Sequence, residues 1–320
     1  MQLRILSRVN QYGTTTANTE GPLEQDGTMR PAVRVSVIVP HYRDLSALRI
    51  CLEKLSKQTL PRDEFEIVVA DNGSPEHEEL RSIVEGKARL VVVGERGAGL
   101  ARNGGVAVAN GEILAFIDSD CQAEPQWLAE GVKALSSYDF VGGRVRVLVD
   151  DLTRMTPTEA FERVFAFDFK SYVTRKGFAG AGNLFCPHEL FQRVGGYRTV
   201  VSEDVDWSRR ARAAGYRIGY APQAVVGHPA RRTWRDLLAK WRRINAEMYH
   251  LADDRSAGAL WWFLRSLLLP ASALAHSPRV IFSRELRGLD QRIGALAVLY
   301  RLRLWRFGDS LRLMLGGAGR

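Results

Sequence analysis

The stretch EILAFIDSD, Glu112–Asp120, joins a short apolar run to two carboxylates that stand two residues apart. The apolar part, Glu112–Ile117, is uninterrupted, which is typical of a strand buried on both faces. Side chains i and i+2 project to the same side of an extended strand, so Asp118 and Asp120 are expected to point together. Two such carboxylates suit a hard cation such as Mg²⁺ or Mn²⁺, although a solvated turn would contain the same residues.

Three further strands of this kind are predicted upstream, and helical patterns separate them. The apolar runs Val35–Val39, Phe65–Ala70 and Arg89–Val93 are short and rich in branched side chains. Leucines recur at helical spacing from Leu45 to Leu55, between the first two runs. Strands that alternate with helices predict a parallel sheet covered by helices on both faces. In such a sheet, ligands bind beyond the carboxyl ends of the strands.

Polar turns follow three of these strands where each strand ends. They are Pro40-His41-Tyr42, Asp71-Asn72-Gly73 and Asp118-Ser119-Asp120. Because the carboxyl ends of parallel strands share one edge, we expect the three turns to converge there. Asp71 has two interpretations, since it could cap its own turn as an Asx-turn or contact a nucleobase.

The second half of the chain continues the pattern less regularly. We predict a strand over Phe140–Val149, a helix over Thr158–Tyr172, a glycine-rich segment at Phe178–Phe185, a helix over Ser202–Ala214 and a strand pair within Arg217–Val226. Glu203 and Asp204 begin the second helix, where a carboxylate either stabilises the helix end or serves as a general base. His228 ends the last strand and is either structural or a metal ligand beside Asp120.

The net charge of +9 is concentrated at the C-terminal end of the chain. Residues 229–320 hold 17 Lys and Arg but only 7 Asp and Glu, whereas residues 1–228 are close to neutral. Within this extension, Trp234–Leu251 and Ile293–Trp305 have basic amphipathic helical patterns. We therefore divide the chain into a flexible leader at 1–33, a main domain at 34–228 and a basic helical extension at 229–320.

The segment Ala257–Ala275 is nearly all apolar, but Arg265 and Pro270 interrupt it. Its length approaches that of a membrane span, and a mid-segment Arg makes a span costly. Three possibilities stay open: a helix lying in the membrane interface, a helix packed on the domain, or a true span.

Cysteine content and the N-terminal residues indicate the compartment. The three cysteines, Cys51, Cys121 and Cys186, are widely spaced and odd in number, which excludes a disulfide framework and a zinc cluster. Residues 1–32 contain no apolar run of the kind found in secretion signals. We expect the working part of the protein to face the cytoplasm.

Three alternative classes fit the sequence less well. A nicotinamide oxidoreductase would need G-x-G-x-x-G directly after the first strand, where Pro40-His41-Tyr42 stands instead. A sugar nucleotidyltransferase would need a Gly-rich, basic loop at the same point. A nucleic-acid-binding protein is suggested by the basic extension, but its arginines alternate with Trp261, Trp262 and long apolar runs. That composition favours a membrane interface over nucleic acid.

Taken together, an ordered series of motifs between Val35 and His228 resembles glycosyltransferase family 2, with the nucleotide-diphospho-sugar transferase (GT-A) fold. The matching stretches are VSVIVPHY (35–42), EIVVADNGSPE (66–76), GAGLARNGGVAVANGEILAFIDSDC (97–121), AGAGNLF (179–185), FQRVGGY (191–197), SEDVDWSRRARAAGYRIGYAP (202–222) and AVVGHP (224–229). The resemblance implies a Rossmann-like mixed α/β sheet flanked by helices. It also implies a metal-dependent transfer of sugar from a nucleotide-diphosphate donor.

On the donor side, the resemblance implies that Pro40 and Tyr42 line the base pocket and that Asp71 accepts from the base, with UDP as the expected nucleotide. Many relatives carry a second Asp where this chain has Asn72. Arg102 is implied to approach the ribose or the diphosphate.

At the metal, the resemblance implies that Asp118 contacts the ribose and that Asp120 binds Mg²⁺ or Mn²⁺. His228 matches a metal-ligand position found in part of the family.

On the acceptor side, Asp204 is the implied catalytic base, while Glu203 holds position or binds the acceptor. Arg210 is implied to neutralise the leaving diphosphate, and Gly182 and Asn183 are implied to form the acceptor-side loop. One base suits a single displacement, which inverts the anomeric centre. A processive synthase is not expected, because the extension lacks a Q-x-x-R-W motif.

The acceptor itself is predicted from the extension. Membrane-attached relatives commonly build exopolysaccharide or envelope glycans on lipid carriers, so we expect a glycan acceptor, lipid-linked through polyprenyl diphosphate. We expect the protein to lie peripherally on the cytoplasmic face of the inner membrane, through residues 229–320.

Overall fold

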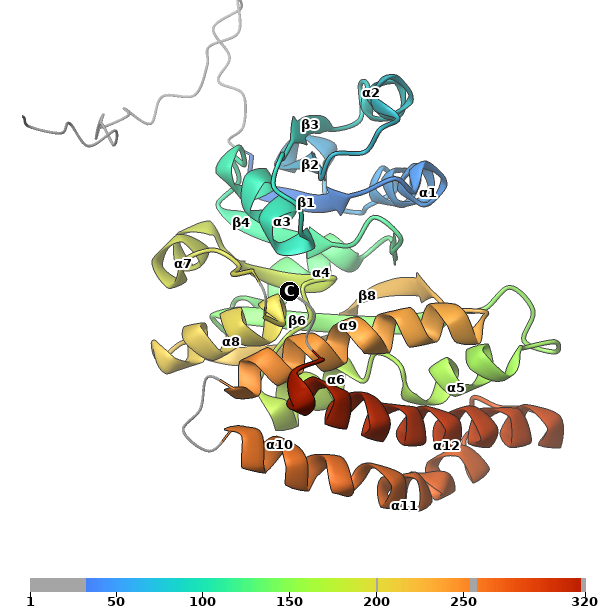
Figure 1. Cartoon of the computed structure of the whole chain (residues 1–320). Helices are drawn as coiled ribbons and strands as arrows, with labels where there is room; N and C mark the ends of the chain where they lie inside the picture. Colours follow the sequence, from blue (N-terminus) through green and yellow to red (C-terminus); the bar gives the residue numbers. More distant parts are fainter. Residues whose placement is uncertain (1–32, 200, 254–257, 318–320) are drawn as a thin grey trace, which may run out of the picture. The chain divides into compact units, whose positions relative to one another are not determined.

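The computed structural model describes residues 33–199, 201–253 and 258–317, so the predicted leader lies outside the described residues except for Val33. From Val33 onward the chain forms one compact unit, built on a sheet of eight strands in the order β3-β2-β1-β4-β7-β6-β8-β5 (Figure 1). The division into a main domain and an extension therefore stays a prediction.

The first half of the sheet is parallel, as its alternating pattern predicts. It comprises β1 (Val35–His41), β2 (Phe65–Asp71), β3 (Arg89–Val92) and β4 (Ile113–Ile117). The connecting helices are α1 (Leu45–Leu55), η1 (Arg62–Glu64), α2 (His77–Val84) and α3 (Ala98–Ala107). β1 pairs in parallel with both β2 and β4, so the turns after these strands lie along one edge.

The second half makes the sheet mixed. It comprises β5 (Gln122–Ala123), β6 (Phe140–Leu148), β7 (Asn183–Pro187) and β8 (Ile218–Pro229). β7 runs antiparallel to both β4 and β6, which confirms a mixed sheet. The predicted strand pair within Arg217–Val226 is wrong, because residues 218–226 belong to the single strand β8. An irregularity after Gly143 lets three residues of β8 bulge without ending its pairing with β6.

Helices cover both faces of the sheet, because alternate residues of each strand point to opposite sides. Val37 and Val39 join the cluster that contains α1, α2 and α4 (Trp127–Ala134). Ile38 joins the opposite cluster, with α3, α7 (His188–Val194) and α8 (Glu203–Ala213). The three cysteines are free and buried.

The remaining helices form a layer beside the sheet (Figure 1). They are α5 (Pro157–Phe165), α6 (Phe169–Ser171), η2 (Tyr172–Lys176), α9 (Trp234–Asp253), α10 (Gly258–Leu267), α11 (Leu269–Ile281), α12 (Leu289–Arg312) and η3 (Leu313–Gly317). The predicted helix over Thr158–Tyr172 is broken between α5 and α6, where Phe167 adopts a φ of 56°. Such a positive φ is disfavoured for a bulky residue and ends the helix.

The extension is joined to α5 by apolar packing and by charge. Phe161 of α5 shares a buried cluster with Leu237 of α9 and Leu299 of α12. In addition, the buried Glu162 accepts hydrogen bonds from Arg231 and from Lys240, each at 3.1 Å. Burial favours a neutral Glu162, but the charges of Lys240 and Arg231 outweigh it and lower the pKa.

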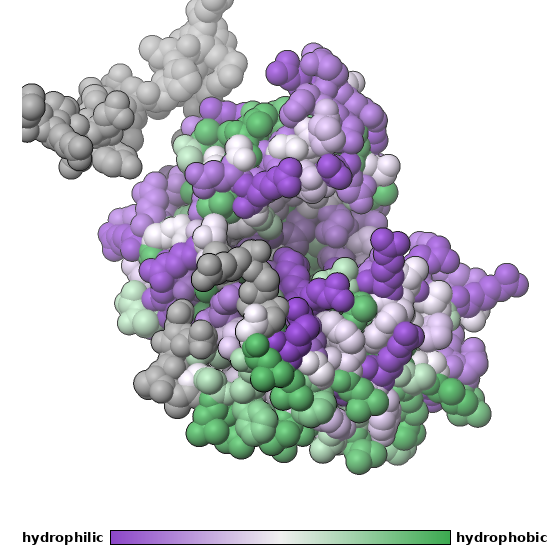
Figure 2. Space-filling view, viewed as in Figure 1, coloured by the Kyte–Doolittle hydropathy of each residue, from purple (hydrophilic) through white to green (hydrophobic). Residues whose placement is uncertain are grey.

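Among the described helices, none is long and apolar enough to cross a membrane alone, whereas α10 and α11 together meet that length and composition but bend by 54°. Large apolar side chains of these helices are exposed, among them Leu260, Leu264 and Leu274, and so is Leu268 between the two helices. Figure 2 shows apolar side chains gathered over α10 and α11 at the lower edge of the molecule.

Candidate active site

A cavity of about 1460 Å³ opens beyond the carboxyl ends of β1 and β4. Its opposite wall is made by the extension, through α9, α10, α11 and α12. Most of the predicted site residues line it, namely Pro40, Tyr42, Arg102, Asp118, Asp120, Glu203, Asp204 and His228. The fold thus brings together residues that are far apart in the sequence.

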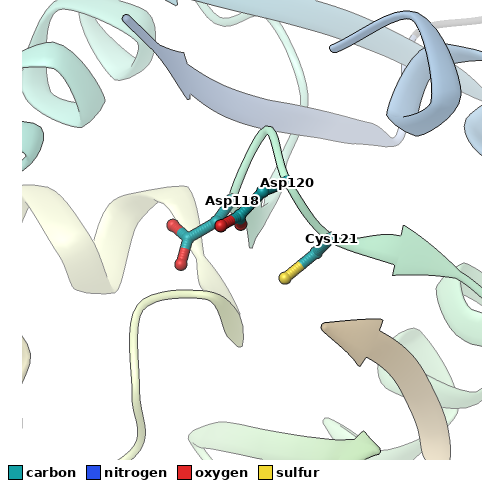
Figure 3. A group of neighbouring side chains, drawn as sticks. All are labelled: Asp118, Asp120 and Cys121. Atoms are coloured by element: carbon teal, nitrogen blue, oxygen red, sulfur yellow. The ribbon is translucent and has the colours of Figure 1, made fainter. Parts of the chain in front are cut away.

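The turn between β4 and β5 supplies a group of possible metal ligands (Figure 3). Ligand atoms of Asp118, Asp120 and Cys121 all lie within 4.8 Å of one another. Burial, with the charges of Asp118 and Asp120, raises the pKa of the Cys121 thiol well above its usual value. The thiol therefore stays protonated, and the two carboxylates are the groups that fit a hard divalent cation.

Gly182 keeps the Asp118 carboxylate accessible. A Cβ atom at this position would lie 2.5 Å from Asp118 Oδ2, which is too close for any side chain without a shift. The glycine predicted for the acceptor-side loop is thus explained by its close approach to a carboxylate.

The structure brings His228 and Asp120 together, as the metal-site prediction requires. His228 Nε2 lies 3.3 Å from Asp120 Oδ2, and Nδ1 donates to the Pro229 carbonyl at 2.7 Å. Burial lowers the pKa of His228, but Asp120 raises it by more, so the net shift is upward. For Asp120, burial is outweighed by His228 and Arg231, which lower its pKa. The bond at Nδ1 orients the ring so that Nε2 faces the carboxylate.

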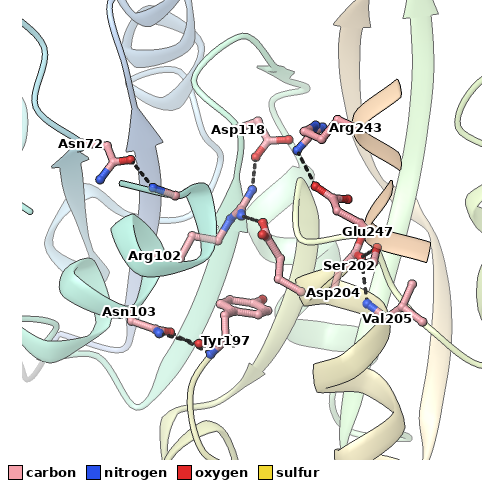
Figure 4. Close-up of polar contacts among 12 residues, drawn as sticks. Asn72, Arg102, Asn103, Asp118, Tyr197, Ser202, Asp204, Val205, Arg243 and Glu247 are labelled. Atoms are coloured by element: carbon pink, nitrogen blue, oxygen red, sulfur yellow. Dashed lines mark hydrogen bonds and ion pairs between the residues drawn. The ribbon is translucent and has the colours of Figure 1, made fainter. Parts of the chain in front are cut away.

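Arg102 holds two carboxylates of the cavity relative to each other. Its guanidinium is buried and donates to Asp118 and to Glu203, each at 2.5 Å (Figure 4). Burial alone would lower the pKa of Arg102, but the charges of Asp118 and Glu203 raise it, so Arg102 stays charged. The predicted contact with the ribose or diphosphate stays a prediction, because protein carboxylates already engage both Nη atoms.

Asp204 fits both roles that the sequence leaves open, a group that stabilises the helix end and a general base. Its Oδ1 accepts from the Val205 amide at 2.8 Å and from the Ser202 hydroxyl at 3.1 Å, in the first turn of α8. Burial, followed by the charge of Glu203, raises the pKa of Asp204. One oxygen thus stabilises the helix end, and Oδ2 has no hydrogen-bond donor among the residues that the structure describes.

The comparisons with known proteins agree with this arrangement. Residues 36–198 match the sequence profile of glycosyl transferase family 2. The chain belongs to this family. The glycosyltransferase AglE of Haloferax volcanii is 31% identical over 219 residues, which cover 66% of this chain and 71% of AglE.

Solved structures show the same fold at lower identity. The mannosyltransferase PcManGT of Pyrobaculum calidifontis, described in complex with GDP-Man and Mn²⁺, matches with a TM-score of 0.52 and 21% identity, over 90% of this chain and 76% of that one. TarS of S. aureus matches with a TM-score of 0.50 and 18% identity, over 84% of this chain and 54% of that one. The predicted GT-A fold and family are confirmed.

One carboxylate of this glycosyltransferase cavity was not predicted from the sequence. Glu247 of α9 lines the cavity, with its Oε1 3.7 Å from Arg243 Nη1 (Figure 4). Burial raises its pKa to about 7, Arg243 opposes that shift, and the charges of Glu203 and Asp204 reinforce it. The sequence shows an Arg and a Glu four residues apart on a helix, but it does not show that this face meets Asp204.

Asp71 is fully buried and does not line the cavity. Its carboxylate accepts from the Ser74 amide, three residues on, with Oδ2 at 3.1 Å, so it stabilises its own turn without the i to i+2 bond of an Asx-turn. The contact with a nucleobase stays a prediction. The neighbouring Asn72 lines the cavity instead, and its Oδ1 accepts from the Gly97 amide at 2.7 Å.

The structure corrects the prediction for Asn183, which does not reach the cavity. The side chain is fully buried and satisfied within the protein. Its Oδ1 accepts from Trp127 at 2.9 Å, and its Nδ2 donates to the carbonyls of Arg144 and Ala224 at 3.0 Å. Asn183 therefore joins β7 to the bulge between β6 and β8.

The prediction for Arg210 is corrected in the same way. Its guanidinium donates to Asp206 and to the carbonyls of Val194, Gly195 and Gly196, the residues that lead out of α7. It braces the connection between α7 and α8 and is not a cavity residue. Arg209, its neighbour, lines the cavity.

Proposed function

We propose that this family 2 glycosyltransferase moves a sugar from a nucleotide-diphosphate donor, with UDP as the nucleotide, to an acceptor hydroxyl, and that the anomeric centre is inverted. The observation that carries this proposal is the Asp204 carboxylate. One of its oxygens is fixed at the start of α8, its pKa is raised, and it shares a cavity with the Asp118–Asp120 pair.

The residues of the chain divide the work of a single displacement. Asp204 Oδ2 takes the proton of the acceptor hydroxyl, and a raised pKa makes the carboxylate a stronger base for that step. Arg102 orients Glu203 and Asp118, which keeps the two substrates at fixed angles to each other. Because a single base serves the reaction, attack occurs from the face opposite the leaving diphosphate.

A divalent cation fits the carboxylates of Asp118 and Asp120, with His228 next to them. The presence of Mn²⁺ in the PcManGT complex supports a metal here, and either Mg²⁺ or Mn²⁺ has the right ligand preference. When bound, such an ion stabilises negative charge on the leaving diphosphate.

We also propose a lipid-linked glycan acceptor and a peripheral position on the cytoplasmic face of the inner membrane, in exopolysaccharide or envelope glycan synthesis. Support comes from the large apolar side chains exposed on α10, α11 and α12, which gather at one edge of the molecule (Figure 2). Arg265 of α10 and Arg303 and Arg306 of α12 line the cavity beside them. An exposed apolar patch flanked by arginines suits an anionic lipid surface.

The donor is tested first. Nucleotide sugars with different bases and sugars are added to the full chain with Mn²⁺, and thermal unfolding is followed, because a bound donor raises the midpoint. We expect UDP-sugars to give the largest shifts. A shift with GDP-sugars alone would replace UDP in the proposal, and a product that retains the donor configuration by NMR would overturn inversion.

A further inference from the structure

Four cations gather at the extension side of the cavity: Lys176 of η2, Arg265 of α10, and Arg303 and Arg306 of α12. We call these residues the cationic cluster. Arg306 is only 5% exposed, and its guanidinium stacks over Trp241 at 4.2 Å. Arg265 stacks over Trp262 at 4.9 Å.

The arginines of this cluster lack acidic partners within the described part of the chain. One buried nitrogen of each has no hydrogen-bond acceptor there, namely Nη1 of Arg265 and Nε of Arg303 and Arg306. Asp309 is the acid that acts on Arg306, but its carboxylate already accepts from Asn245 at 3.0 Å and from Arg312 at 2.9 Å.

Such an arrangement is costly for the protein alone. Burial lowers the pKa of Arg306 to about 9, and the charges of Arg265 and Arg303 act in the same direction. The pKa of Lys176 is also lowered, by burial and by the same three arginines, although the charge of Asp168 opposes that shift. Arg306 is buried, Arg265 and Arg303 are half-buried, and Lys176 is exposed at the edge of the cluster. Like charges removed from water without an anion destabilise a fold, so a bound anion would stabilise this cluster.

The cluster opens onto an apolar rim. Trp261, Leu264 and Leu268 line the same cavity and are between 46% and 67% exposed. A ligand that fits both parts has an anionic group for the arginines and an apolar chain that lies over the α10 rim.

We infer that the cationic cluster binds the phosphate or diphosphate group of an amphiphilic acceptor, whose apolar chain lies over Trp261, Leu264 and Leu268. This inference rests on the proposed function, since the sugar hydroxyl of that acceptor must reach Asp204 in the same cavity. The donor diphosphate is placed elsewhere, at the Asp118–Asp120 turn of the sheet. The donor diphosphate and the phosphate group of the acceptor therefore bind to opposite walls of the cavity.

Calorimetric titration of the full chain separates these sites. Mn²⁺ and saturating UDP occupy the donor side, and the probes are farnesyl diphosphate, farnesol and inorganic pyrophosphate. We expect farnesyl diphosphate to bind most tightly. Arg306→Gln and Arg265→Gln should each weaken it by at least about tenfold, because each removes a charged hydrogen-bond donor.

Arg301→Gln is the matched control, because Arg301 is exposed on the same helix and stacks on Trp234 outside the cluster. It should leave the affinity for farnesyl diphosphate unchanged, and UDP should bind all these variants equally. If Arg306→Gln weakens UDP as much as farnesyl diphosphate, the cluster serves the donor and the inference is wrong. Equal binding of farnesol and farnesyl diphosphate would show that the cluster does not bind the anionic group. Equal binding of pyrophosphate and farnesyl diphosphate would show that the apolar chain does not contribute to binding.

Thermal unfolding is a second measurement, and it distinguishes an arginine that binds a ligand from one that only stabilises the fold. Without ligand, Arg306→Gln should unfold at a higher temperature than Arg301→Gln, because it removes a buried charge without a partner. Farnesyl diphosphate should stabilise the wild type and not Arg306→Gln. A drop in the midpoint for Arg306→Gln, together with retained farnesyl diphosphate binding in Arg265→Gln, would assign the cluster to folding. Failure of these tests with intact donor transfer would leave the proposed function standing.

Discussion

The two walls of the cavity differ in how far their charged side chains are paired with opposite charges. On the sheet wall, Arg102 is shared by Asp118 and Glu203, and His228 is paired with Asp120. On the extension wall, Lys240 is paired with Glu162, but the arginines of the cationic cluster lack acidic partners among the described residues. Two of them, Arg265 and Arg306, stack on tryptophans instead. A paired wall is organised before substrate arrives, as catalysis requires. Charges without partners would instead be stabilised by the anion that we propose they bind.

The strongest test of the sheet wall is Asp204→Asn. An amide cannot accept the hydroxyl proton, so turnover should fall by about 10²–10⁴-fold. The affinity for the nucleotide should stay near that of the wild type, since Asp204 faces the acceptor. Steady-state kinetics and nucleotide titration measure the two effects separately. Near-normal turnover in this variant would show that another residue is the base, and Glu247 would be the first candidate.

Glu162→Gln tests the ion pairs that join the extension to α5. The change leaves Arg231 and Lys240 without their shared carboxylate at a site where Glu162 is 1% exposed. Unfolding in denaturant should show a loss of about 3 kcal/mol. Glu285→Gln is the control, because its ion pair with Arg163 is exposed and should contribute less than about 1 kcal/mol. Equal losses in the two variants would show that Glu162 does not anchor the extension.

The metal side of the sheet wall is tested by Asp120→Ala. Nucleotide affinity in the presence of Mn²⁺ should fall by at least about tenfold, since even residues that only orient metal ligands contribute that much. Affinity without metal should be unchanged. Glu124→Ala removes a nearby carboxylate that pairs with Arg146 away from the cavity and should have no such effect. Unchanged Mn²⁺-dependent affinity in Asp120→Ala would remove Asp120 from the metal site.

The smallest expected effect concerns pH. Burial and the charge of Glu203 raise the pKa of Asp204, so the base is protonated, and kcat falls, at a higher pH than for an ordinary Asp. Glu203→Gln removes the neighbouring negative charge and should move the acid limb of kcat to lower pH. Arg301→Gln should leave the limb in place. A limb that does not move in Glu203→Gln would mean that another group governs it.

Local patterns predict the parallel half of the sheet well. Continuous branched runs such as Val35–Val39 are buried on both faces, and no other part of the chain has to be known to recognise them. The position of Asp118 and Asp120 at a strand end follows from the period of two. The mixed half is harder, because β7 begins inside a glycine-rich segment. Pro222 marks an irregularity in β8, but it does not show that the strand continues beyond the bulge.

The site residues show the same difference between what local motifs indicate and what packing decides. Asp120 and His228 are recognised by where they stand in the motifs, and they do meet. Asn183 and Arg210 stand in equally good motifs, yet Trp127 and the carbonyls after α7 take up their hydrogen bonds. Glu247 lies in a helix without a family motif, and only packing brings it to the cavity.

By itself, the sequence determined the family, the parallel strands of the sheet and a basic extension after His228. Those features depend on neighbouring residues, whose side chains alternate or repeat at fixed periods. Only the tertiary structure decided which charges are paired. Arg102 and Glu203 are 101 positions apart, and the cationic cluster draws on η2, α10 and α12. Pairing depends on distances and burial across elements, and no local pattern encodes those. The extension is therefore more than a basic tail, because it forms one wall of the cavity.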